Sequence, residues 1–264
     1  MRVSRWMAGT MLAGLGITAG MMAGCGGPGA RAQQQLGEAQ LAAAAGHYSR
    51  AEQLVDPVIR AHGGRKELAA AYYVRSQCRI RAGQRDAARQ DLDMALRLKP
   101  DADLRAQIEA QLGNLAFDED AYPTASLMYA RAVGRLPHLP PTDRIMLQYG
   151  VALQRSGQFD AARRVYAELI HDFRGSPHAG TAAVKQSWGE NYFAIQCGAF
   201  SRPSSAQELV GALRARGLNA EISTEVRGSS RLSVVRVGRF PTYADAARLL
   251  ARVRGVASDA FIVP

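Results

Sequence analysis

The chain reads Gly46-His47-Tyr48, then Gly83-Gln84-Arg85, Asp120-Ala121-Tyr122 and Gly157-Gln158-Phe159, four phrases that each begin 37 residues after the last. An alanine follows at the same distance from the start of every phrase, at Ala51, Ala88, Ala125 and Ala162. Self-similarity at a fixed period of this length is the signature of a repeat protein, in which each unit is one supersecondary element.

The residues around each phrase have the spacing of two helices joined by a tight turn. Gly at the start of the turn favours the left-handed backbone that ends a first helix. Antiparallel helices approach closely only where the contact lacks bulk. In the helix before each turn, one equivalent position holds a small residue in every unit: Ala39, Ser76, Gly113 and Gly150. In the helix after each turn, one equivalent position holds Val55, Leu92, Tyr129 and Tyr166, and another, three residues later, holds Val58, Ala95, Ala132 and Leu169.

These units resemble the tetratricopeptide repeat, whose period is roughly 34 residues, with three residues added between units. The resemblance implies a helical solenoid of four units over residues 32–188. Thr181 to Trp188 is expected to form a capping helix, because a solenoid must cover its last apolar face. Some other array of helical hairpins is the alternative.

The resemblance further implies a concave face, lined by the first helix of each unit, that binds an extended or helical peptide. Three amides and one valine share a register there: Gln40, Gln77, Asn114 and Val151. Such amides can hydrogen-bond the backbone of an extended peptide. Nearby charged residues are expected to add selectivity: Arg81, Asp118 and Arg155. The alternative is that all of these are ordinary solvated helix residues.

From residue 189 onward the period changes, which predicts a second domain over 189–264. Strands are expected over 192–200, 219–226, 232–237 and 260–263, and helices over 203–216 and from Thr242 onward. Gly217 ends the first helix, and residues 228–230 form a hairpin turn. The order βαββαβ predicts one four-stranded antiparallel sheet with both helices on one face. The whole chain is therefore an α+β multidomain protein.

This segment resembles the SPOR domain, the sporulation-related repeat. The phrases that carry the resemblance are Tyr192-Phe193-Ala194-Ile195-Gln196-Cys197-Gly198-Ala199-Phe200 and Val235-Arg236-Val237-Gly238-Arg239-Phe240, with Ala246 and Leu250. The resemblance implies binding of peptidoglycan glycan strands that amidases have stripped of stem peptides, on the exposed face of the sheet.

Strand alternation predicts which side chains face that ligand. Ile195, Cys197, Val235 and Val237 are expected to pack on the helices. The expected glycan-binding residues face outward: Tyr192, Gln196, Leu232 and Arg236. A Gln amide can pair with N-acetyl groups, and an Arg with the lactyl carboxylate of the glycan. Val234 stands where many members of the family have an arginine. The alternative for Gln196 and Arg236 is ordinary strand polarity.

The N-terminus has the pattern of a secretory signal: Arg2 and Arg5, a charge-free apolar run, and then Met22-Ala23-Gly24-Cys25. The last phrase resembles the bacterial lipobox, which implies cleavage before Cys25 and acylation of its thiol, including palmitate. Residues 1–24 are then a signal peptide and 25–31 a lipid anchor and flexible tether. The absence of Asp after the cysteine favours the outer membrane, facing the periplasm. A plain signal peptide or an uncleaved membrane helix is the alternative.

The formal net charge of +10 is spread along the chain, so no nucleic-acid surface is expected. Cys78 and Cys197 lie in apolar patterns, and the sequence is compatible with two buried thiols or a disulfide. No cofactor or metal is expected, because the five histidines are not spaced as ligands. The resulting hypothesis is a non-enzymatic, lipid-anchored adaptor that binds peptidoglycan and a protein partner in cell division or envelope maintenance. A wall hydrolase and a general envelope scaffold, whose last domain binds protein, are the competing functions.

Overall fold

The computed structural model describes residues 28–61 and 64–264. The signal segment and Cys25 lie outside the described residues, so the structure does not test the lipid anchor. The chain divides into two compact units, one ending at Gln148 and the other spanning Tyr149 to Pro264. Each unit is described separately below.

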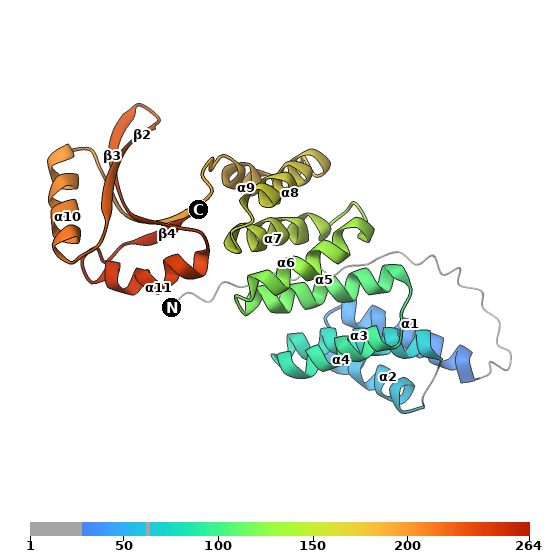
Figure 1. The fold of residues 1–264 in the computed structure, drawn as a ribbon. Helices are drawn as coiled ribbons and strands as arrows, with labels where there is room; N and C mark the ends of the chain where they lie inside the picture. The colour runs from blue at the N-terminus through green and yellow to red at the C-terminus, as the bar shows by residue number, and fades with distance from the viewer. Residues whose placement is uncertain (1–27, 62–63) are drawn as a thin grey trace. The chain divides into compact units, whose positions relative to one another are not determined.

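Antiparallel helical hairpins form the part of the chain with the 37-residue period (Figure 1). The first three pairs belong to the first unit: α1 (Pro28–Ala44) with α2 (Tyr48–Arg60), α3 (Arg65–Arg81) with α4 (Arg85–Arg97), and α5 (Ala102–Asp118) with α6 (Tyr122–Ala132), which continues into η1 (Val133–Arg135). The division between the units falls inside α7 (Thr142–Arg155), which pairs with α8 (Phe159–Asp172). The capping helix was expected over Thr181 to Trp188; the observed helix, α9 (Pro177–Gln186), begins earlier and ends before Trp188.

The turn of every hairpin has the same backbone geometry. The first residue of each phrase has a positive φ: Gly46 at 83°, Gly83 at 76°, Asp120 at 58° and Gly157 at 83°. The next residue donates its N–H to a carbonyl five residues earlier, as in His47 to Ala42 at 2.8 Å and Ala121 to Ala116 at 2.9 Å. This bond closes the helix end in a Schellman-type cap. The sequence repeat is therefore a repeat of turn geometry, as predicted.

The small residues mark the helix crossings, as the sequence predicted. A Cβ atom on Gly113 would lie 2.7 Å from Cε1 of Tyr129, and one on Gly150 would lie closer still to the ring of Tyr166. Both tyrosines are fully buried. In the third and fourth hairpins, the tyrosine ring thus occupies the space that a side chain on the glycine would need.

We expect Gly150→Ala to destabilise the protein by about 1–3 kcal/mol, because the added methyl group overpacks a fully buried ring. Gly211→Ala is the matched control, since a Cβ there meets nothing within 4 Å in the second unit. Alanine at that helical position should be stabilising by about 0.5–1 kcal/mol. Thermal unfolding of both variants measures the difference, and equal midpoints would contradict the assignment of Gly150 to a helix crossing.

A buried ion cluster, which the repeat pattern did not predict, joins three helices of the first unit. Asp91 of α4 is 3 % exposed and accepts two hydrogen bonds from Arg75 of α3, at 3.0 and 2.8 Å. Arg79 lies 2.9 Å from the same carboxylate, and Asp56 of α2 lies 3.3 Å from Arg75. These bonds raise the pKa of Arg75, chiefly through Asp91. A carboxylate this deeply buried requires such pairing.

The C-terminal segment forms one four-stranded antiparallel sheet in the order β2-β3-β1-β4. Its strands are β1 (Phe193–Phe200), β2 (Ala220–Arg227), β3 (Ser230–Phe240) and β4 (Phe261–Val263). Helices α10 (Pro203–Ala215) and α11 (Tyr243–Arg254) pack on one face (Figure 1). The predicted βαββαβ order and sheet are therefore confirmed.

Phe159 of α8 belongs to the same hydrophobic core as this sheet. Its ring centroid lies 5.3 Å from that of Phe193, and the guanidinium of Arg155 lies 4.3 Å from the ring centroid of Tyr243. The last hairpin and the sheet thus share packing within the second unit. The domain division at residue 188 remains a prediction, but a fragment that begins there would lack Phe159.

Candidate functional site

The residues expected to line a peptide groove differ in their exposure and in the hydrogen bonds that they form within the protein. Gln40 is exposed on α1. Gln77 forms a side-chain hydrogen bond with buried Tyr73. Asn114 accepts a hydrogen bond from the Tyr129 hydroxyl at 2.9 Å and donates one to Gln111 at 3.3 Å. The three amides are therefore not equivalent, and Asn114 serves the helix crossing.

The charged residues expected in the groove also have internal partners. Arg81 lies 5.6 Å from the ring centroid of Tyr48, and Asp118 lies 3.6 Å from Arg85. Partial burial raises the pKa of Asp118, while Arg85 opposes that shift. Arg155 lies over Tyr243 in the second unit. These contacts leave the binding role of the predicted groove residues a proposal.

We expect Asn114→Ala to lower the free energy of unfolding by about 1–3 kcal/mol, because the buried Tyr129 hydroxyl loses its acceptor. Adding Tyr129→Phe should recover part of that loss, since the hydroxyl that had donated to Asn114 would then be absent. Urea unfolding of the two single variants and the double variant measures the coupling. If the losses of unfolding free energy in the two single variants simply add in the double variant, the hydrogen bond contributes nothing to stability.

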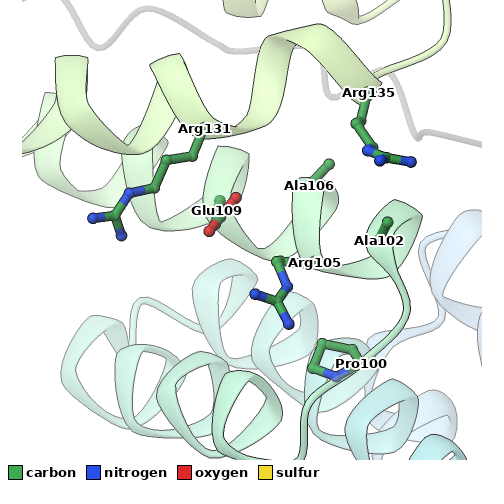
Figure 2. Close-up of a pocket in the computed structure, with 7 residues that line it drawn as sticks. All are labelled: Pro100, Ala102, Arg105, Ala106, Glu109, Arg131 and Arg135. Carbon is green, nitrogen blue, oxygen red and sulfur yellow. The ribbon is translucent and has the colours of Figure 1, made fainter.

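A cavity of about 300 Å³ lies in the first unit, away from these groove residues (Figure 2). It is lined by Pro100, Ala102, Arg105, Ala106, Glu109, Arg131 and Arg135. Arg105 and Glu109 come from α5, while Arg131 comes from α6 and Arg135 from η1. The lining contains three guanidiniums and one carboxylate, so its net positive charge favours an anionic group.

The outward face of the C-terminal sheet is the second candidate site. Ile195, Cys197, Val235 and Val237 lie in the core beneath the helices, as predicted. Gln196 of β1 pairs with Arg236 of β3 across the sheet, with Phe261 of β4 as its other neighbour. Alternation therefore places Gln196 and Arg236 side by side on the face opposite the helices.

The expectation that this face is solvated is wrong at its centre. Gln196 is 5 % exposed and Val234 is fully buried, whereas Tyr192 and Leu232 are partly exposed. Arg236 is also in contact with an aromatic residue: the ring centroid of Trp188 lies 5.3 Å from its guanidinium carbon. An arginine that was predicted to be open to solvent thus lies against an indole.

Arg236 is held in place by residues of β2 as well as by Trp188. Its terminal nitrogens pair with Glu225 and donate to the Ser223 hydroxyl, the latter at 3.1 Å. Its Nε is buried and has no hydrogen-bond partner among the described residues. Such an orphaned donor is uncommon and requires an explanation.

Gln196 lies beside Arg236 on the neighbouring strand, and its side chain is also almost fully buried, at 5 % exposed. A buried N–H without an acceptor costs about 1–3 kcal/mol, so a ligand that supplies an acceptor to the Nε of Arg236 would recover that cost. The guanidinium and the neighbouring amide together form a candidate site for a polar ligand.

Comparison with known proteins identifies this sheet. Residues 189–264 match the SPOR domain family. The C-terminal segment is a SPOR domain. SPOR domains are non-catalytic, extracytoplasmic modules that bind peptidoglycan, so the matched family agrees with the fold and the face described above. Trp188 stands one residue before the matched segment.

The helical part was also compared. A solved structure titled "Crystal structure of YrrB: a TPR protein with an unusual peptide-binding site" is 19 % identical, with a TM-score of 0.48, covering 61 % of this chain and 80 % of that one. No curated protein matches the chain. The assignment of tetratricopeptide-type repeats therefore rests on the turns and crossings described above.

Several side chains around the SPOR sheet escaped the sequence reasoning. Ser223 and Glu225 alternate along β2 and could have been found from that alternation. Arg239 lies 5.2 Å from the ring centroid of Tyr192, and 3.4 Å from Glu221. Trp188 was expected at the end of the capping helix, but α9 ends at Gln186 and Trp188 lies beyond it, against Arg236.

The remaining expectations concern cysteines, metals and membrane spans. Cys78 and Cys197 are free and buried, and burial raises the pKa of each thiol to about 11. The described residues contain no group of His, Cys, Asp or Glu side chains that could hold a metal ion. Within residues 28–61 and 64–264, no helix is long and apolar enough to cross a membrane.

Proposed function

We propose that this protein is a lipid-anchored periplasmic adaptor. Its SPOR sheet binds the denuded glycan of septal peptidoglycan, and its helical repeats bind a protein partner. The observation that carries the proposal is the buried, unpartnered Nε of Arg236 beside the buried side chain of Gln196.

The chemistry of the glycan fits this pair. Glycan stripped of its stem peptides presents N-acetyl groups, hydroxyls and a lactyl carboxylate. A Gln amide donates and accepts, which suits an N-acetyl group. The guanidinium of Arg236 suits the carboxylate, and its charge is partly offset by Glu225. Tyr192 and Leu232, partly exposed on the same domain, supply the less polar contacts.

The anchor and the repeats complete the proposal. The lipobox-like phrase ending at Cys25 supports attachment to the outer membrane, with the protein facing the periplasm. In the repeats, Gln40 and Arg81 are exposed and are the groove residues most accessible to a partner. Neither activity requires a cofactor, and no catalytic residue is assigned.

The whole chain, fused behind Pro264 to a fluorescent protein that folds in the periplasm, tests the proposal. We expect it to gather at division sites and to spread over the envelope in cells that lack amidases, because amidases produce the stripped glycan. The whole chain is used because a fragment starting near residue 187 would remove Phe159 from the core. Uniform staining in wild-type cells would contradict the septal role and favour the general scaffold.

A further inference from the structure

Trp188 lies beyond the end of α9 and one residue before the segment that matches the SPOR family. We propose that its indole forms the aromatic side of the glycan site and stacks against the C–H face of a sugar ring. This inference rests on the proposed function, since it names a contact residue for the same ligand.

Three contacts fix the position of the Trp188 ring. Its Nε1 donates a hydrogen bond to the carbonyl oxygen of Tyr192 at 3.3 Å. Its ring meets that of Tyr192 edge-on, with centroids 6.4 Å apart. Arg236 lies against the ring at 5.3 Å. A side chain that is already ordered loses little entropy when a ligand binds, which favours its use as a contact.

The neighbouring aromatic residue has the same kind of partner. Arg239 lies 5.2 Å from the ring centroid of Tyr192, so two aromatic rings, each paired with a guanidinium, adjoin one another. Both rings keep part of their surface in solvent. This pairing defines an aromatic–guanidinium wall made of Trp188, Tyr192, Arg236 and Arg239.

The chemistry of stripped glycan matches this wall. The C–H face of a pyranose is apolar and positively polarised, and it is attracted to the negative face of an indole. The lactyl carboxylate of the same polymer pairs with a guanidinium. Since Gln196 is 5 % exposed and Val234 fully buried, the wall offers surface that the sheet centre lacks.

Tryptophan fluorescence tests the contact directly. The chain has two tryptophans, Trp6 and Trp188, so a protein of residues 26–264 keeps every described element and only Trp188. Soluble glycan strands freed of stem peptides are the probe. We expect the emission of Trp188 to change as these strands are added, with the same dependence on glycan concentration as glycan binding measured independently. Trp188→Ala should bind about tenfold more weakly, whereas Trp188→Phe should keep most of the affinity.

Tyr72→Ala is the control, because it removes an aromatic–arginine pair of the same kind, with Arg75, from the first unit. It should bind stripped glycan normally. Unchanged Trp188 emission while glycan is captured would overturn the inference and leave the proposed function standing. Equal or tighter binding by Trp188→Ala would also overturn it, by showing that the indole merely covers the site. Failure of the parent protein to capture stripped glycan would overturn both.

Discussion

Serine in place of Cys25 is expected to leave the protein without lipid and free in the periplasm. The thiolate is the nucleophile that forms the thioether, and a hydroxyl cannot replace it. Each buried methylene of an acyl chain contributes roughly 0.8 kcal/mol, so the loss of all chains removes the anchor entirely. Palmitate labelling and membrane fractionation measure the effect. Cys78→Ser is the control, and undiminished label on the Cys25 variant would remove the lipoprotein assignment.

Replacing Gln196 by leucine should weaken glycan binding by about 1–3 kcal/mol while leaving the fold about as stable as before. Leucine has a similar size and is apolar, so it fills the same buried space without a polar group to desolvate. The ligand, in contrast, loses a buried hydrogen bond. Combining Gln196→Leu with Arg236→Ala should cost about 1–3 kcal/mol of binding per site, where each 1.4 kcal/mol is tenfold.

Gln207→Leu and Arg231→Ala are the matched controls, because both side chains are exposed elsewhere on the same domain. Capture of stripped glycan and thermal unfolding should be measured on all variants. A Gln196→Leu protein that unfolds earlier yet binds normally would show that the amide has a structural role.

The parts of the fold that repeat or alternate could be read from the sequence. The glycine that opens a turn phrase predicted the positive φ at Gly83, and the small residue that recurs at the same position from unit to unit predicted the crossing at Gly150. Alternation in the last domain correctly assigned Ile195 to the core and Gln196 to the opposite face. Each of these features depends on local geometry that recurs with a fixed period.

The features that the sequence did not show depend on contacts between elements. Trp188 lies against Arg236 from a segment without regular structure, so this contact could not be foreseen. Asn114 occupies the predicted register, but its amide is used by Tyr129 from the next helix. Phe159 completes a repeat phrase and also enters the core beneath the sheet. Periodicity places a side chain on a face, but it does not reveal the partner that meets it.

Co-sedimentation of the whole chain with purified peptidoglycan, before and after amidase digestion, tests the central claim most directly. Digestion removes the stem peptides and leaves the glycan strands, which are the proposed ligand of the SPOR sheet. We predict that binding rises strongly after digestion and that the combined Gln196→Leu and Arg236→Ala protein shows no such rise. Equal binding to intact and digested material, or none to either, would contradict the account.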